Sequence, residues 1–88
     1  MESQKVTIKN KTGLHARPAS IFVKTASGFK SDITIYKDTS KASGKSLINI
    51  LALGLAKDVE LNITASGEDE KEAVQALVDL INSKFGEE

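Results

Sequence analysis

The chain has 88 residues, with 12 basic side chains, 12 acidic side chains, one histidine and no cysteine. Its balanced charge argues against a dedicated nucleic-acid binder, and the lack of cysteine excludes disulfides, thiol nucleophiles and cysteine-based metal sites. The length suits a single domain over residues 1–88, and without a signal-like N-terminus or an apolar run of the ~20 residues that span a bilayer, we expect a cytoplasmic protein outside the membrane.

The first part of the chain predicts a strand, a loop and a helix. Val6 and Ile8 alternate with polar residues, as is typical of a half-buried strand, and a loop at 10–13 follows. The helix begins at about residues 16–18, because proline suits a first turn and disfavours helical backbone in the residue before it. Helical spacing selects Ala19, Phe22, Val23 and Ala26 as its core face, and Gly28 ends it.

Three more strands and two more helices are expected. Ile33 and Ile35 mark the second strand, a turn at 37–40 leads to a short third strand at 41–43, and residues 59–65 show the clearest alternation of the chain. For the last helix we expect Ser66 as N-cap, acidic residues 68–70 at the positive end, and Lys84 and Gly86 at the exit. The core stripe of this helix is Ala73, Val74, Leu77, Val78 and Ile81, with Leu80 beside it.

A short middle helix is expected to start after Ser46, whose hydroxyl would cap it. The order is then β-α-β-β-α-β-α, an α+β fold with three helices on one face of a four-stranded antiparallel sheet. Too many apolar residues surround this middle helix for a small one-sided core to bury, so some are expected to form an exposed docking patch. The apolar residues around this helix are Leu47, Ile48, Ile50, Leu51 and Leu53.

The run around the single histidine is the most distinctive of the chain. It reads Gly13-Leu14-His15-Ala16-Arg17-Pro18. His15 would lie just outside the helix, beside backbone N–H groups such as that of Ala16 and the positive end of the helix dipole, which together bind anions. Arg17 in the first turn opposes the dipole, and a bound phosphate would remove that conflict. A neutral imidazole is a nucleophile, so we interpret His15 as the acceptor of a covalent phosphoryl group.

This run closely resembles the active-centre signature of the HPr family, the histidine-containing phosphocarriers of the bacterial phosphoenolpyruvate-dependent sugar phosphotransferase system. The resemblance extends to residues 44–54 and 65–70 and covers residues 4–85. It implies an open-faced β-sandwich fold. It also implies that enzyme I phosphorylates His15, that enzyme IIA sugar-transporter components then accept the group, and that the chain has no independent catalysis.

The resemblance also assigns roles to individual residues. Arg17 would stabilise the phosphoryl charge together with the backbone of Ala16. Partner docking would involve Ser20, Lys24, Leu47, Ile48 and Leu51. Residues 1–45 carry nine basic and three acidic side chains, whereas residues 46–88 carry three and nine, so the half that contains His15 is suited to steering acidic partner surfaces.

Ser46 has two interpretations. Alone it is an ordinary helix cap, but in many Gram-positive relatives the matching serine is phosphorylated by a dedicated kinase, and the phosphoserine form would then recruit a transcriptional regulator. Those relatives often carry methionine at the positions of Ile48 and Leu51, where this chain differs. The residues Gly44-Lys45-Ser46 also match the end of a P-loop, but Thr39 stands where its first glycine is required, which argues against that nucleotide site.

Three alternatives to the carrier remain at this stage. They are a purely regulatory HPr-like module that acts through Ser46, a nitrogen-related paralogue of the carrier, and a hydrolase with His15 as covalent nucleophile. The hydrolase needs a further acid and several phosphate-binding cations, and near His15 only Arg17 is well placed. We expect no cofactor, no metal, because one histidine supplies too few ligands, and a monomeric state.

Overall fold

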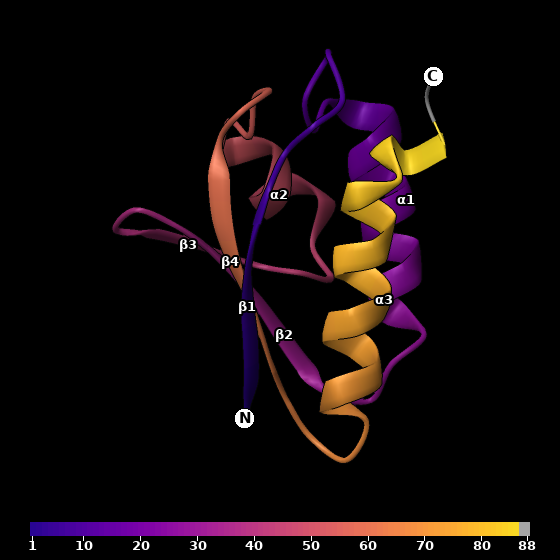
Figure 1. Ribbon diagram of the computed structural model, residues 1–88. Helices are drawn as coiled ribbons and strands as arrows, with labels where there is room; N and C mark the ends of the chain where they lie inside the picture. Colours follow the sequence, from indigo (N-terminus) through magenta and orange to yellow (C-terminus); the bar gives the residue numbers. More distant parts are fainter. Residues whose placement is uncertain (87–88) are drawn as a thin grey trace.

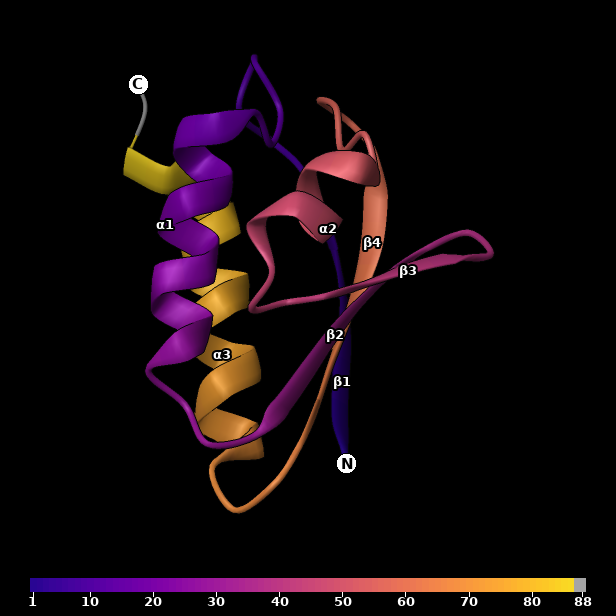
Figure 2. The same cartoon turned by 180° about the vertical axis from the view of Figure 1, so that it is seen from behind.

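The structure, a computed structural model, describes residues 1–86 and has the expected α+β order. Its elements are β1 (Glu2–Thr7), α1 (Ala16–Ser27), β2 (Asp32–Lys37), β3 (Ser40–Ser43), α2 (Leu47–Ala52), β4 (Glu60–Ser66), α3 (Glu70–Asn82) and a 3-10 turn, η1 (Lys84–Gly86). The strands form one antiparallel sheet in the order β1-β4-β2-β3, and the three α-helices cover one of its faces (Figures 1 and 2). The predicted fold class is therefore confirmed.

The core lies between the sheet and the helices. α3 packs on β1 and β4, and α1 lies beside both α3 and α2 (Figure 1). Alternation along the strands sends every second residue into this layer, and each large apolar side chain that is fully buried there contributes roughly 1.5–3 kcal/mol. The largest fully buried apolar side chains are Phe22, Ile8, Ile35, Ile50, Leu61, Ile63, Leu77 and Ile81.

Small differences from the expected core have simple causes. On α1, Pro18 is buried with Ala19, Phe22 and Ala26, whereas Val23 is only partly buried at the margin of the core. Ile8 lies one residue beyond β1 and is still fully buried, and its N–H donates to the carbonyl of Val59 over 3.0 Å. The sheet pairing thus continues past the end of the strand.

The expectation that Ser66 caps the last helix is wrong. Ser66 is the last residue of β4, where it pairs with Asp32 of β2, so the chain stays extended through it. Gly67 then turns the chain with φ 155°, and α3 begins after Asp69. The N–H of Gly67 donates to the side chain of Glu70 over 3.1 Å, which stabilises the start of the helix.

α3 also ends earlier than predicted, at Asn82, with Ser83 as its C-cap. Lys84 and Phe85 then adopt left-handed backbone, with φ 59° and 57°, and this reversal buries the Phe85 side chain. Gly86 lies beyond the helix, in η1. Among residues 1–86, no helix is long and apolar enough to cross a membrane.

Candidate functional site

His15 occupies the N-cap of α1. Its backbone is extended (φ −83°, ψ −169°), and its carbonyl accepts the N–H of Ala19 over 3.0 Å, so the helix begins at Ala16, within the predicted range. An α-helix leaves the N–H groups of its first turn without an intrahelical partner, and Ala16 and Arg17 supply two of them, since Pro18 has no N–H. The side chains of His15, Ala16 and Arg17 are all exposed. An anion next to the imidazole can therefore reach backbone donors.

The loop before His15 is fastened to the loop that follows α2. The N–H of Leu14 donates to the carbonyl of Leu55 over 2.7 Å, and the Asn10 side chain donates to the carbonyl of Gly13 over 2.7 Å. Gly13 has φ +67°, and a Cβ added to it would lie 2.5 Å from the carbonyl oxygen of Leu55, so only glycine fits here. The backbone of His15 is thus held in place while its imidazole remains at the surface.

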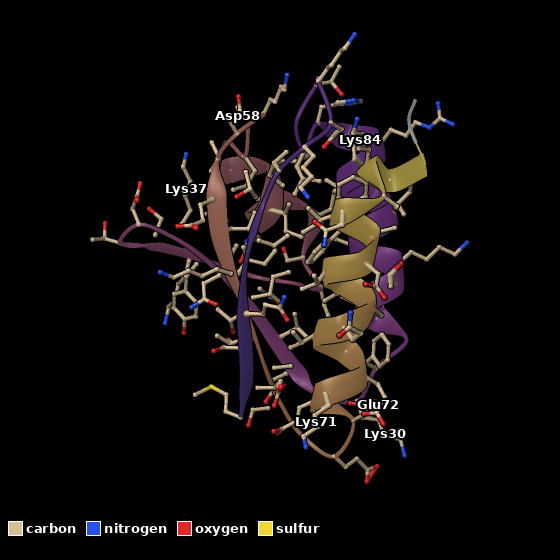
Figure 3. All side chains as sticks on the ribbon, in the orientation of Figure 1. Lys30, Lys37, Asp58, Lys71, Glu72 and Lys84 are labelled. Carbon is tan, nitrogen blue, oxygen red and sulfur yellow. The ribbon has the colours of Figure 1, made fainter. Side chains whose placement is uncertain are left out.

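The charges around the start of α1 favour an anion. The first turn of α1 contains no acidic residue and contains Arg17. The turn η1 lies beside the start of α1 in both ribbon views, and Figure 3 places Lys84 there. Asp58 lies at the same end of the molecule but on the side of β4, and Lys30, Lys71 and Glu72 lie at the opposite end. An anion at the start of α1 would thus meet backbone N–H groups and the positive charge of the nearby Arg17.

Ser46 is the N-cap of α2, as predicted. Its Oγ accepts the N–H of Asn49 over 3.3 Å, and its N–H donates to the carbonyl of Ser43 over 3.2 Å. The neighbouring Lys45 sends its ammonium to the carbonyl of Phe29, just after α1, over 2.8 Å. This bond ties the start of α2 to the end of α1. The sequence reasoning missed it, because nothing local marks a lysine that binds a backbone carbonyl far along the chain.

The apolar residues of α2 divide into a buried and an exposed group, as their distribution around the helix predicts. Ile50 is fully buried and Leu47 partly so, but Ile48 is 79% exposed and Leu51 is 40% exposed. The predicted docking residues of α1, Ser20 and Lys24, are also exposed. Because α1 and α2 pack against each other, we define the docking surface as the predicted docking residues of the two helices, four of which are exposed and one of which, Leu47, is partly buried. It consists of Ser20, Lys24, Leu47, Ile48 and Leu51.

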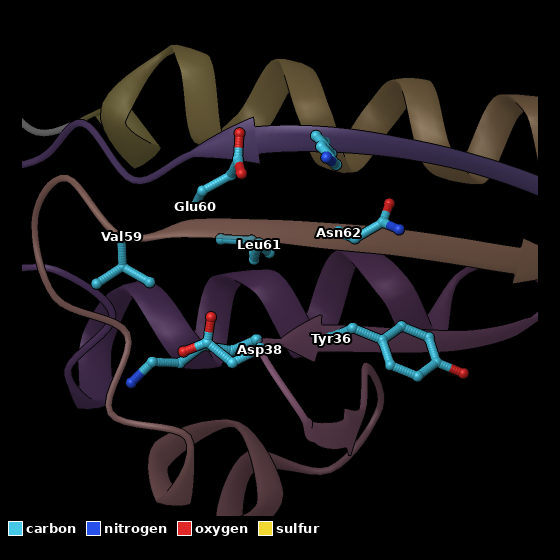
Figure 4. A pocket seen from close by; sticks show the side chains of 8 residues that line it. Tyr36, Asp38, Val59, Glu60, Leu61 and Asn62 are labelled. Carbon is cyan, nitrogen blue, oxygen red and sulfur yellow. The ribbon is translucent and has the colours of Figure 1, made fainter.

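A polar pocket lies on the sheet face that the helices leave uncovered (Figure 4). Lys5, Asn62 and Tyr36 face one another across β1, β4 and β2 in register, and Asp38 and Glu60 add negative charge. None of the functional-site residues predicted from the sequence lines this pocket. Over residues 1–86, no group of three or more His, Cys, Asp or Glu side chains is arranged to hold a metal ion.

Comparisons with known proteins all lead to one family. A protein-family model, the PTS HPr component phosphorylation site, matches residues 2–83. The chain is 45% identical over 87 residues to the phosphocarrier protein HPr of Neisseria meningitidis serogroup A, covering 99% of this chain and 98% of that one. The structure of HPr-C-His from Thermoanaerobacter tengcongensis superposes with a TM-score of 0.97 at 53% identity, covering 100% of this chain and 99% of that one. The structure of the HPr dimer from the same organism gives a TM-score of 0.77, also at 53% identity, with 99% and 100% covered.

Proposed function

Because this chain belongs to the HPr family of phosphocarriers of the phosphotransferase system, we propose that it carries a phosphoryl group on His15. Enzyme I, charged from phosphoenolpyruvate, donates the group, and an enzyme IIA sugar-transporter component accepts it. The observation that carries the proposal is the position of His15, exposed at the N-cap of α1 with the N–H groups of Ala16 and Arg17 beside it.

In the transfer step, a neutral imidazole nitrogen of His15 attacks the phosphorus of the donor. A P–N bond forms as the bond between phosphorus and its former carrier breaks, and that carrier keeps the electron pair. The new phosphoryl oxygens are negatively charged, and the Arg17 guanidinium and the backbone N–H groups of Ala16 and Arg17 bind them. The second transfer reverses these roles. The chain therefore serves as donor and acceptor in turn, without catalysing a reaction of its own.

The docking surface gives both partners the same approach to His15. Ile48 and Leu51 expose apolar area that an isolated domain of this size does not need, and such area is typical of an interaction site. Lys24 adds positive charge on the adjacent α1. Enzyme I and enzyme IIA would therefore bind one after the other at one surface, which requires that neither complex be permanent.

Regulation through Ser46 is the second candidate function. The Ser46 hydroxyl stands at the start of α2, next to the exposed Ile48 in the same helix turn. A phosphate there would add charge beside an apolar docking surface, which would weaken one partner and give another a new contact. A serine kinase and a transcriptional regulator would be those further partners. A regulatory module without transfer on His15, or a nitrogen-related paralogue, would use the same surfaces.

We also infer that the working form is a monomer in the cytoplasm that binds neither nucleic acid nor membrane. A surface that successive partners must reach gains nothing from burial in a dimer. A relative at 53% identity, HPr of Thermoanaerobacter tengcongensis, has a structure described as a dimer. Sedimentation equilibrium of the purified protein would give the mass of the particle in solution. A stable dimer at cellular concentrations would contradict the inferred monomer.

The decisive experiment is the intact mass of the protein after incubation with phosphoenolpyruvate and a bacterial enzyme I. The wild type is expected to gain one phosphate that mild acid removes, because a P–N bond is acid-labile, and the same should hold for Ser46→Ala. His15→Ala is expected to gain none. An acid-stable phosphate that persists in His15→Ala would overturn the carrier and favour a regulatory module. Release of inorganic phosphate from esters by the isolated protein would instead favour the hydrolase.

A further inference from the structure

Lys37 connects the sheet to the end of α2. It is the last residue of β2, and its ammonium donates to two consecutive carbonyls after α2, those of Leu53 over 2.9 Å and Gly54 over 3.2 Å. Both carbonyls lie just past the last turn of α2, where the negative end of the helix dipole favours a cation, so a lysine is well suited to bind them. Figure 3 labels Lys37 at the side of the molecule where α2 and β4 lie.

The loop before His15 hydrogen-bonds to the carbonyl of Leu55, the residue that follows Leu53 and Gly54. Gly54 turns the chain with φ +65°, and the next residue, the buried Leu55, accepts the N–H of Leu14 over 2.7 Å. Contacts thus run without a gap from Lys37 through residues 53–55 to Leu14, the residue before His15. Gly13 lies so close to this segment that an added Cβ would meet the backbone of Ala56 at 2.8 Å.

We propose that Lys37 is a positioning residue that holds His15 at a fixed place relative to the exposed residues of α2. β2 pairs with β4 over residues 32–36 and with β3 over residues 34–37, so the backbone of Lys37 is held in the sheet by its pairing with Ser40 of β3. Its ammonium holds the loop that follows α2, and this loop holds the loop that ends at His15. The inference rests on the proposed function of His15, because a fixed geometry matters when one partner must touch both His15 and α2.

Loss of the Lys37 ammonium would act on that geometry rather than on the imidazole. Residues 53–55 would lose two charge-assisted hydrogen bonds, and the bond from Leu14 to Leu55 would open more often. A partner that binds the docking surface would then find His15 displaced or mobile. The expected cost falls on recognition by enzyme I, with a smaller effect on the transfer step itself.

Three variants separate this role from general effects of charge or stability. Lys37→Met removes the ammonium and keeps an unbranched side chain of similar length, whereas Lys37→Arg keeps a cation with N–H donors. Lys41→Met is the matched control, because Lys41 is an exposed lysine on the neighbouring strand β3 and its loss changes the net charge equally.

The first measurement is amide hydrogen exchange by NMR, with the N–H of Leu77 in the core of α3 as reference for global unfolding. In Lys37→Met we expect the Leu14 N–H to exchange about tenfold faster relative to Leu77, whereas Lys37→Arg and Lys41→Met stay near wild type. Equal acceleration at Leu14 and Leu77 would show that Lys37 acts only on global stability, and no acceleration would show that it does not hold this loop. Either result overturns the proposal.

The second measurement is the kinetics of phosphorylation by enzyme I. In Lys37→Met, KM for this protein is expected to rise several-fold with kcat changed less than about twofold, and Lys37→Arg should restore it. An unchanged KM would overturn the positioning role. If the wild type itself takes no phosphate, the proposed function of His15 fails, and the exchange measurement still decides whether Lys37 holds the loop.

Discussion

The carboxylate of Asp69 accepts hydrogen bonds from both the hydroxyl and the backbone N–H of Ser31, a residue 38 positions earlier. The N–H of Lys30 donates to the other carboxylate oxygen over 2.8 Å. These bonds fasten the start of α3 to the segment between α1 and β2, at the end of the molecule opposite the start of α1 (Figure 3). These bonds therefore stabilise the fold at the end of the molecule opposite the proposed site at His15.

This carboxylate makes stability depend on pH in the acid range. The hydroxyl of Ser31, followed by the N–H of Lys30, lowers the pKa of Asp69 below 3.8. Because the folded pKa is lower than the unfolded one, Asp69 stabilises the fold above pH 3.8, and this contribution is lost as the pH falls through the folded pKa. Asp69→Asn is therefore expected to unfold at lower urea than wild type near pH 7, with a smaller difference at about pH 2.5.

Glu72→Gln is the matched control for that comparison. Glu72 is an exposed carboxylate in the first turn of the same helix, and its substitution removes one negative charge without breaking the bonds to Ser31. The change in its unfolding free energy should stay within about 0.5 kcal/mol. If the difference between Asp69→Asn and wild type were equally large at both pH values, the charge of the carboxylate would not be its source.

The Gly13→Ala substitution is expected to damage both the fold and the His15 loop. A methyl group would be strained at φ +67° and would collide with the carbonyl oxygen of Leu55 at 2.5 Å. The loss in unfolding free energy should reach about 2–4 kcal/mol, which urea denaturation monitored by circular dichroism would measure.

Gly86→Ala separates the two causes of that loss. Gly86 has a similar φ of +75°, but a Cβ there would meet nothing within 4 Å. Only the backbone strain is then felt, at about 1 kcal/mol. Equal losses for the two variants would show that the close approach of Gly13 to Leu55 contributes nothing.

Substitution by alanine is expected to change stability at one isoleucine of α2 but not at the other. Ile50 is fully buried, so Ile50→Ala should cost about 2–5 kcal/mol of unfolding free energy. Ile48 is 79% exposed, so Ile48→Ala should leave stability within about 0.5 kcal/mol of wild type. If Ile48 belongs to the docking surface, the same variant should bind enzyme I about tenfold more weakly by calorimetry. If Ile48→Ala were stable and bound enzyme I with unchanged affinity, Ile48 would not be part of the docking surface.

Local patterns predicted most of the fold, because the strands and helices here follow regular alternation. Val59, Leu61, Ile63 and Ala65 show the two-residue period that β4 uses, and the cap of α2 follows from Ser46 and its neighbours. The misplaced cap of α3 has a different origin. Whether Ser66 caps a helix or continues a strand depends on its pairing with Asp32, and local sequence carries no signal for that pairing.

In the candidate site, too, the local features could be predicted from the sequence and the long-range contacts could not. The position of His15 at the N-cap follows from residues within a few positions of it, above all Pro18. The contacts that hold the loop were missed, because Lys37 binds Leu53 across 16 residues and Leu14 binds Leu55 across the chain. A lysine at the end of a strand looks the same in sequence whether it binds a helix terminus or water. Only the tertiary arrangement distinguishes them.

Ser46 allows its two roles, as cap and as site of regulation, to be measured separately. Ser46→Ala removes the oxygen that accepts the N–H of Asn49 and should cost about 0.5–2 kcal/mol of unfolding free energy. Ser46→Asp keeps a good capping oxygen, so its stability should stay near wild type.

Ser46→Ala is expected to be the less stable of the two variants, but Ser46→Asp is expected to be the poorer substrate of enzyme I. In Ser46→Asp, a carboxylate stands beside the exposed Ile48, where it disfavours burial of an apolar surface, so KM for phosphorylation of His15 should rise. Ser46→Ala adds no charge and should be phosphorylated like wild type, despite its lower stability. If Ser46→Asp were phosphorylated as well as wild type, charge at this position would not reach the docking surface, and Ser46 would be a helix cap only.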